Sequence, residues 1–169
     1  KWLTAAMIMT LVDEGKIALD VPLATYVPAA TGEVGRITMR QLLSLTSGII
    51  ADENVPCYTD GAVSLQECAR DFLAHGLVHP AGEAFRYGGQ HMAVAGAVAE
   101  IVTGRSFVDL FQERIAGPLH MTKTSFYQVG TGARDNVTHP SPAGGAYSSL
   151  GDYGRFLEMI YHDGVAPDG

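Results

Sequence analysis

The sequence predicts a mostly helical chain, and three observations support this fold class. Four Ser or Thr residues are each followed three positions later by an acid or amide, a spacing in which side chains satisfy backbone donors at a helix N-terminus. Glycines follow the apolar runs that these pairs open, as expected where a left-handed residue ends a helix. Segments with the β-branched or aromatic content of strands are short and few.

The first helix is expected to begin at or before Lys1 and to end at Gly15, because apolar side chains recur on one helix face between Leu3 and Val12. Four further helices are expected over residues 39–45, 65–74, 107–115 and 150–162, behind the pairs Thr38 and Gln41, Ser64 and Glu67, Ser106 and Asp109, and Ser149 and Asp152. The glycines expected to end them are Gly48, Gly76, Gly117 and Gly164.

Another helix is expected over residues 90–103, ending at Gly104. Its many alanines and Gly96 allow other backbones to approach closely, so we expect it to be buried. The candidate strands are residues 16–19, 36–38 and 124–128, and residues 131–146 form the longest irregular stretch. Loops of that length inside compact domains are often functional.

The composition is that of a globular chain with one core. Of 169 residues, 47% are hydrophobic, and 11 Lys and Arg against 18 Asp and Glu give a formal charge of −7. An acidic chain without a basic cluster is a poor binder of phosphate backbones, so no nucleic-acid partner is expected. No apolar run approaches the about 20 residues that a membrane span needs. We interpret residues 1–169 as a single partial domain, truncated at both ends, because Lys1 already stands in a helical pattern.

The histidines do not predict a metal site. His75 and His79 are four residues apart, but Gly76 and Pro80 interrupt the helix that would place both on one face. Neither is followed by the Glu that a zinc-protease helix requires. We therefore expect neither a metal nor an organic cofactor.

Tyr87 is the first candidate for chemistry. It follows the turn-forming sequence Pro-Ala-Gly-Glu at residues 80–83 and precedes Gly88 and Gly89, a setting that can present its phenol to a cleft. Taken alone, Tyr87 is better interpreted as a packed loop tyrosine. Lys1 taken alone is a solvated terminal side chain.

Several blocks in a fixed order change that interpretation. They read KWLTAA and LVDEGKIALDVP at residues 1–6 and 11–22, ITMRQLLSLTSG at 37–48, PAGEAFRY at 80–87, GPLHMTKT at 117–124 and PAGGAYSS at 142–149. Together they resemble the serine β-lactamase and penicillin-binding-protein family, in the branch of class C β-lactamases, D-alanyl-D-alanine carboxypeptidases and esterases. The resemblance covers nearly the whole chain. It implies the helical lobe of the β-lactamase/transpeptidase-like α/β sandwich, with most of the antiparallel sheet missing.

The resemblance also implies catalytic roles for Lys1 and Tyr87. Lys1 matches the lysine of the family's S-x-x-K motif, whose nucleophilic serine would stand three positions upstream of this sequence. Tyr87 matches the tyrosine of the Y-x-N element. In such a site the phenol and the ammonium share a proton network that draws the proton from serine and later returns one to the leaving group. Either group can be the general base.

Two departures from the family pattern concern the substrate. Gly89 stands where many relatives have Asn, so the amide that would hold a substrate carbonyl is missing. The backbone at Gly89, a water or the side chain of Gln90 are the alternatives for substrate binding there. The Lys/His-x-Gly strand that supplies an oxyanion-hole amide would lie beyond Gly169. This chain alone is therefore not expected to be active.

The resemblance implies a serine hydrolase that acts through an acyl-serine intermediate. Its substrate would be a small molecule or peptide, namely an ester, a β-lactam or a D-amino-acid peptide, and its location the periplasm, the cell envelope or the exterior. The alternative is a noncatalytic binding or regulatory homologue with the same fold. A self-contained helical interaction domain is a third interpretation, whereas a partial lobe would expose a large apolar face.

Cys57 and Cys68 are eleven residues apart, one in a polar loop and one in the expected helix after Ser64. The spacing permits either a disulfide or two separate buried thiols. The extracytoplasmic location that the resemblance implies favours the disulfide.

Overall fold

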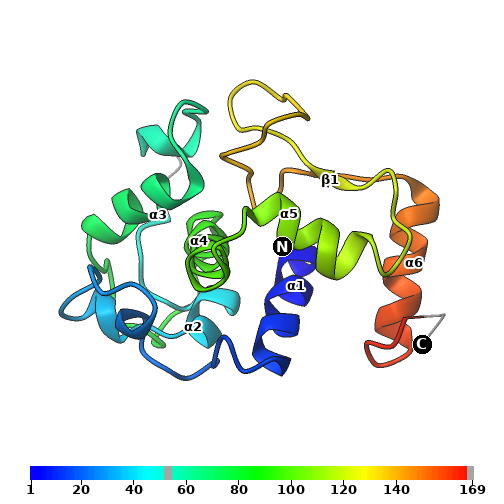
Figure 1. Cartoon of the computed structure of the whole chain (residues 1–169). Coiled ribbons are helices and arrows are strands. Elements are labelled where there is room, and N and C mark those ends of the chain that lie inside the picture. Colours follow the sequence, from blue (N-terminus) through cyan, green and yellow to red (C-terminus); the bar gives the residue numbers. More distant parts are fainter. Residues whose placement is uncertain (52–54, 167–169) are drawn as a thin grey trace.

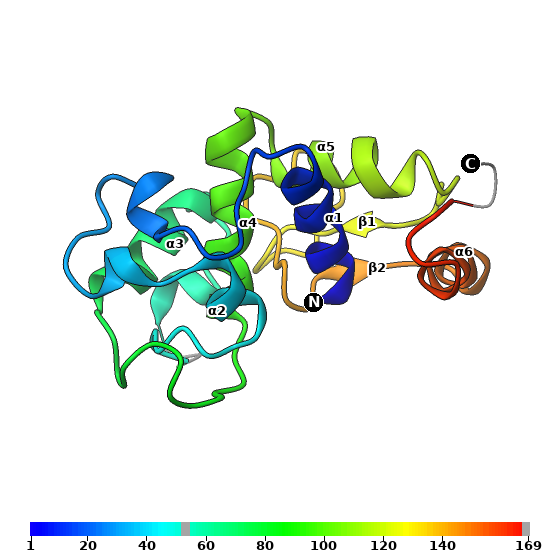
Figure 2. The same cartoon turned by 90° about the horizontal axis from the view of Figure 1, so that it is seen from below.

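The computed structural model describes residues 1–51 and 55–166, and it is mostly helical, as predicted (Figure 1). In chain order the elements are α1 (Trp2–Asp13), η1 (Leu23–Thr25), η2 (Val34–Arg36), α2 (Met39–Leu43), η3 (Pro56–Tyr58), α3 (Leu65–Ala74), α4 (Gln90–Thr103), α5 (Phe107–Phe111), η4 (Gln112–Ala116), β1 (Ser125–Phe126), β2 (Ala146–Tyr147) and α6 (Leu150–Tyr161). Both views place α6 at one edge of the molecule, beyond the two short strands (Figures 1 and 2).

Helix α4 lies at the centre of the fold and contacts α1, α2, α3 and α5 (Figure 1). Each of its residues from Gln90 to Glu100 is buried, which confirms the expected buried helix. Its small side chains allow this close packing: a Cβ atom added to Gly96 would lie 3.0 Å from Pro142 Cγ and 3.1 Å from Phe107 Cδ2. Helix α4 ends at Gly104, whose left-handed φ of 66° confirms the predicted stop.

Capping explains why most helices begin where the sequence predicts. Both members of the reciprocal pair form hydrogen bonds at α2 and at α3. At α5 and α6 the serine caps the backbone, but the acid does not complete the pair. The carboxylate of Asp152 instead accepts hydrogen bonds from the Lys123 backbone N–H at 2.7 Å and the Thr124 hydroxyl at 2.9 Å.

The helix expected over residues 107–115 departs from its prediction. Helix α5 ends at Phe111 and continues as the single π-helical turn η4, which Gly117 N–H closes by donating to the Gln112 carbonyl at 2.7 Å. Gly117 has a right-handed φ of −63°, so its predicted left-handed conformation is wrong. His120 takes the positive φ in this region, whereas Gly48, Gly76 and Gly164 have the positive φ expected of them.

The strands are fewer than predicted within the described residues. Strands β1 and β2 pair antiparallel, with Ser125 opposite Tyr147 and Phe126 opposite Ala146, so only part of the expected strand 124–128 forms. Residues 16–19 form a turn and bend, and residues 36–38 contribute one isolated bridge between Thr38 and Pro22. The local β-branched pattern is misleading there because, in the part of the chain that the structure describes, no strand lies beside these segments to pair with them.

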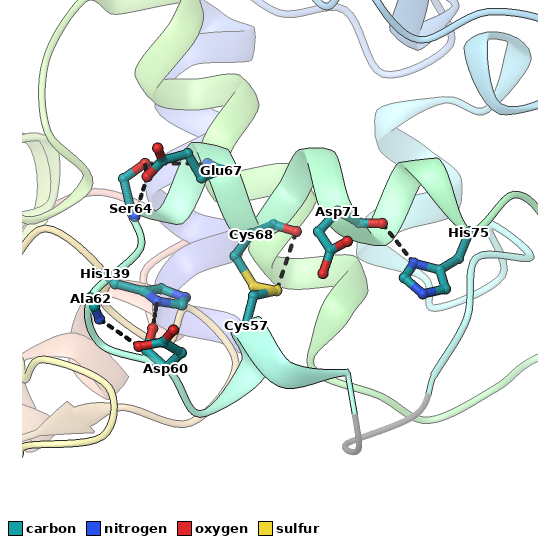
Figure 3. Close-up of a disulfide and its surroundings, with 9 residues drawn as sticks. All are labelled: Cys57, Asp60, Ala62, Ser64, Glu67, Cys68, Asp71, His75 and His139. Atoms are coloured by element: carbon teal, nitrogen blue, oxygen red, sulfur yellow. Dashed lines mark hydrogen bonds between the residues drawn. A yellow bond between two sulfur atoms is a disulfide. The ribbon is translucent and has the colours of Figure 1, made fainter.

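Cys57 and Cys68 form a disulfide with a Cα–Cα distance of 5.2 Å (Figure 3). The bond joins η3 to the first turn of α3, which confirms the bridged alternative. Across residues 1–51 and 55–166 no group of three potential metal-ligating side chains is found, and none of the helices there has the length and apolarity to cross a bilayer.

The N-terminus of α1 is fastened to the segment that precedes β2. The buried Thr4 hydroxyl donates to the Pro142 carbonyl at 2.6 Å. The Lys1 backbone nitrogen donates to the Ala143 carbonyl at 3.1 Å. These contacts join residues about 140 positions apart in the sequence, so Thr4 links α1 to a segment that local sequence patterns do not connect to it.

Replacing Thr4 by Val should lower the free energy of unfolding by about 1–3 kcal/mol, because a buried carbonyl loses its donor without a change in side-chain shape. Chemical denaturation of the protein measures this change. The matched control is Thr103→Val, since the Thr103 hydroxyl makes local bonds at the end of α4: it donates to the Ala99 carbonyl and accepts from the Arg105 backbone N–H. Equal effects of the two substitutions would contradict a special role for the Thr4 contact.

Replacing both Cys57 and Cys68 by Ala should lower the free energy of unfolding by about 2–3 kcal/mol, because the bond closes a short loop in the unfolded chain. Urea unfolding of the oxidised protein, the reduced protein and the double variant measures the effect. Reduction should lower the free energy of unfolding of the unmodified protein and leave that of the double variant unchanged. An equal change in both proteins would contradict the disulfide.

Candidate active site

Lys1 and Tyr87 meet at one pocket although 86 positions separate them in the sequence. The Lys1 ammonium nitrogen Nζ donates to the Tyr87 hydroxyl oxygen at 3.1 Å, and it lies 4.3 Å from the centroid of the ring. Tyr87 is 71% exposed, so its phenol is open to solvent on one side. This is the pair to which the family resemblance gives catalytic roles.

The segment that precedes Tyr87 is held in place by a neighbouring loop. The backbone of residues 78–86 donates to residues 45–48 through three hydrogen bonds: Val78 to Gly48 at 2.8 Å, Gly82 to Thr46 at 2.8 Å and Arg86 to Leu45 at 2.9 Å. Gly48 has a φ of +79°, and a Cβ atom there would overlap the His79 carbonyl oxygen. The two segments therefore lie against each other, and the last bond fixes the residue directly before Tyr87.

The pocket has a volume of about 350 Å³. Its lining is rich in tyrosines and glycines and consists of Lys1, Ala51, Tyr58, Tyr87, Gly88, Gly89, Tyr127, Ser141, Ala143, Gly144 and Gly145. A cavity of similar volume, about 340 Å³, lies beside η2 and α3, but its lining is mainly small apolar side chains with Arg70. The Lys1–Tyr87 pair, and not the volume, singles out the first pocket.

Part of the pocket lining is built by the segment that leads into β2. Gly145 N–H donates to the Ser141 carbonyl at 2.8 Å, and the Gly145 carbonyl accepts from Tyr127 N–H at 3.1 Å. The Tyr127 ring stacks on Tyr147 with a centroid distance of 6.2 Å. The short sheet and this stacking thereby hold Tyr127 in the pocket lining.

Gly88 and Gly89 are required by side chains that pack against them. A Cβ atom at Gly88 would lie 2.7 Å from Gln90 Oε1 and 2.9 Å from Ala51 Cβ. Gln90, which we expected to bind substrate, is completely buried behind Gly88 and is outside the pocket lining. Gly89 does line the pocket, as expected of a substrate-binding position.

Tyr58 is one of the pocket residues that sequence reasoning missed. It lies in a polar loop without periodicity, and no motif marks it. The available signal for such a residue was the pair Gly88 and Gly89. Two adjacent positions without side chains at the start of a helix indicate that groups from other segments pack closely there.

The buried His91 lies near the pocket without adding charge to it. Its Nδ1 atom is 2.9 Å from the Ser47 hydroxyl, and both residues are fully buried. Burial lowers the pKa of His91 below its ordinary value of 6.5, and the nearby Lys1 charge acts in the same direction. His91 is therefore neutral at pH 7, and it links α4 to the loop that carries Gly48.

Comparisons with known proteins show the family to which the chain belongs. The Beta-lactamase family model matches residues 1–168. Penicillin-binding protein 4 of Amycolatopsis lactamdurans is 31% identical over 195 residues, an alignment that covers 98% of this chain and 50% of the relative. Among solved structures, a candidate β-lactamase from Bacteroides dorei DSM 17855 has a TM-score of 0.87 and 39% identity, covering 100% of this chain and 50% of that one.

A D-stereospecific amidohydrolase from a Streptomyces species is also similar, with a TM-score of 0.72 and 25% identity over 99% of this chain and 60% of that one. This chain spans about half the length of the first two relatives. The helical core around α4 and the family match over residues 1–168 lead to one assignment. The chain belongs to the β-lactamase family of penicillin-binding-protein-like proteins.

Proposed function

We propose that this chain is the helical lobe of a serine hydrolase that acts through an acyl-serine intermediate on an amide, a β-lactam or an ester. The hydrogen bond from Lys1 to Tyr87 in an open pocket is the observation that carries the proposal. An amine and a phenol within hydrogen-bond distance can pass a proton between them, as general acid–base catalysis requires.

In this proposal the nucleophile is a serine three residues before Lys1. Residues three apart lie on the same face of a helix, so the amine would be next to the hydroxyl. Lys1 and Tyr87 would take the serine proton during acylation and return a proton to the leaving group. Backbone N–H groups near the nucleophile would stabilise the tetrahedral oxyanion.

The names of the relatives support hydrolysis of an acyl bond: one is a penicillin-binding protein, another a candidate β-lactamase and a third a D-stereospecific amidohydrolase. We propose a small-molecule or peptide substrate and no cofactor. The disulfide supports a periplasmic, envelope or secreted location, because disulfides persist in oxidising compartments.

The exposed apolar side chains support the helical-lobe interpretation. Helix α6 exposes Leu150, Leu157 and Ile160, and α1 exposes Trp2 and Met9. Large apolar side chains exposed on two helices are typical of a face that packs against another part of a protein. We propose that the sheet of the sandwich covers it.

Tyr87→Phe in the complete protein should lower the rate of acylation or deacylation by about 100-fold or more, the scale of a general acid–base group. The substitution removes the hydroxyl that accepts from Lys1 and keeps the ring. Stopped-flow kinetics with a chromogenic ester and a chromogenic cephalosporin measure both steps. The rate on the ester relative to the rate on the cephalosporin reports the substrate class.

The matched control is Tyr26→Phe, because Tyr26 is outside the pocket lining and away from α1 and α6, and its hydroxyl accepts from the Ala18 backbone N–H at 2.7 Å. It should turn over both substrates like the unmodified protein. If Tyr87→Phe does so as well, Tyr87 is a packing residue. If the unmodified protein binds acyl compounds without forming an acyl adduct by intact-mass spectrometry, the noncatalytic homologue is the correct interpretation.

A further inference from the structure

The space beside Gly89 is occupied by the Tyr58 side chain. A Cβ atom at position 89 would lie 2.9 Å from Cε2 and 3.1 Å from Cζ of the Tyr58 ring, and closer still to the hydroxyl oxygen. Real Cβ atoms essentially never come within 3.0 Å of another heavy atom. The hydroxyl of Tyr58 therefore lies where a side chain at residue 89 would begin.

The ring of Tyr58 is packed from behind. It contacts the Phe72 ring of α3 with a centroid distance of 6.3 Å and an interplanar angle of 60°. The cavity among Tyr58, Phe72, Gly89 and Ala93 has a volume of only about 10 Å³, too small to receive the ring. A side chain added at position 89 cannot push Tyr58 inward without disturbing α3 or α4.

The backbone on both sides of Tyr58 is also fixed. Cys57, directly before it, is bonded to Cys68 on α3 (Figure 3). Two residues after it, the Asp60 carbonyl accepts from His139 Nδ1 at 3.0 Å (Figure 3). The Gly61 carbonyl then accepts from the Gln128 side-chain amide at 2.7 Å. The disulfide on one side and these hydrogen bonds on the other hold Tyr58 at the pocket.

We propose that Tyr58 is a substrate-binding residue whose hydroxyl replaces a side chain at position 89, and that the Cys57–Cys68 disulfide holds it in place. The inference rests on the proposed hydrolase function. A phenol hydroxyl both donates and accepts hydrogen bonds, so it can donate to a carbonyl oxygen in the acyl part of the substrate. Tyr58 and Gly89 line the pocket together with Lys1 and Tyr87, which brings that hydroxyl to the acyl group.

The first experiment offers the complete protein two chromogenic esters as substrates. One has an amide carbonyl in its acyl part, and in the other methylenes replace that amide. Tyr58→Phe should lower kcat/KM for the amide-bearing ester by about tenfold, the effect of one lost hydrogen bond, mainly through KM. The ester without the amide should change less than twofold. Tyr26→Phe is the control and should change kcat/KM for neither ester.

Equal losses on both esters would overturn the proposal, because a merely structural role of the hydroxyl does not distinguish them. No loss on either ester would overturn it as well. If the unmodified protein hydrolyses neither ester and forms no acyl adduct, the proposed hydrolase function fails, and the role of Tyr58 fails with it. If the unmodified protein hydrolyses the esters and Tyr58→Phe shows no selective loss on the amide-bearing ester, only the proposed role of Tyr58 is contradicted.

The second experiment tests whether Tyr58 and residue 89 share one space. Gly89→Asn alone should lose most activity on the amide-bearing ester because the new side chain meets the Tyr58 ring. Combining it with Tyr58→Ala frees that space, so the double variant should recover at least about tenfold in kcat/KM over Gly89→Asn. Thermal unfolding of each variant shows whether it is folded. A folded double variant no better than Gly89→Asn would contradict the shared space.

The third experiment tests the disulfide as a positioning device. Cys57→Ala combined with Cys68→Ala should raise KM for the amide-bearing ester several-fold and leave the ester without the amide unchanged. Adding Tyr58→Phe to this variant should then cause less than twofold further loss, because the hydroxyl is no longer held in place. A full tenfold further loss would show that Tyr58 binds substrate without the disulfide and would overturn that part of the proposal.

Discussion

The close approach of other segments to α4 is the constraint on which the structure depends. A helix buried on all sides can be packed tightly only if its side chains are small, and α4 meets that condition. At Gly96 the absent side chain leaves room for Pro142, whose carbonyl accepts from Thr4 at the start of α1. At Gly89, where α4 begins, the absent side chain leaves room for Tyr58. The pocket thus lies at the N-terminus of α4, where Gly89 is part of its lining.

This arrangement explains how residues remote in sequence meet. Lys1 stands at the start of α1, and Tyr87 stands just before α4. The two helices contact each other, and the loop of residues 45–48 fixes the backbone before Tyr87. The amine and the phenol converge because both helix starts face the same pocket. His91 on α4 is buried and neutral, so α4 places no second positive charge near Lys1.

Local rules predicted the helices well and the strands poorly. The bounds of α3 could be read from Ser64, Glu67 and Gly76, because capping involves only neighbouring residues. The sequence did not reveal the π-helical turn after Phe111 or the right-handed Gly117, because the backbone hydrogen bonds there depart from the usual helix spacing. Residues 16–19 have a strand-like composition, but a strand also needs a partner, which composition does not reveal. Motif order named Lys1, Tyr87 and Gly89 as candidates, and all three line one pocket. Tyr58 emerged only from the three-dimensional packing against Gly89.

The central claim is that Lys1 and Tyr87 act as one proton-transferring unit, and a double-mutant cycle tests it most directly. Acylation rates would be measured for Lys1→Met, Tyr87→Phe and the double variant of the complete protein. If the two groups share a proton, the double variant should be no more than a few-fold slower than the slower single variant, because either substitution already disables the unit. Losses that multiply, so that the double variant loses the product of the two single effects, would contradict the account.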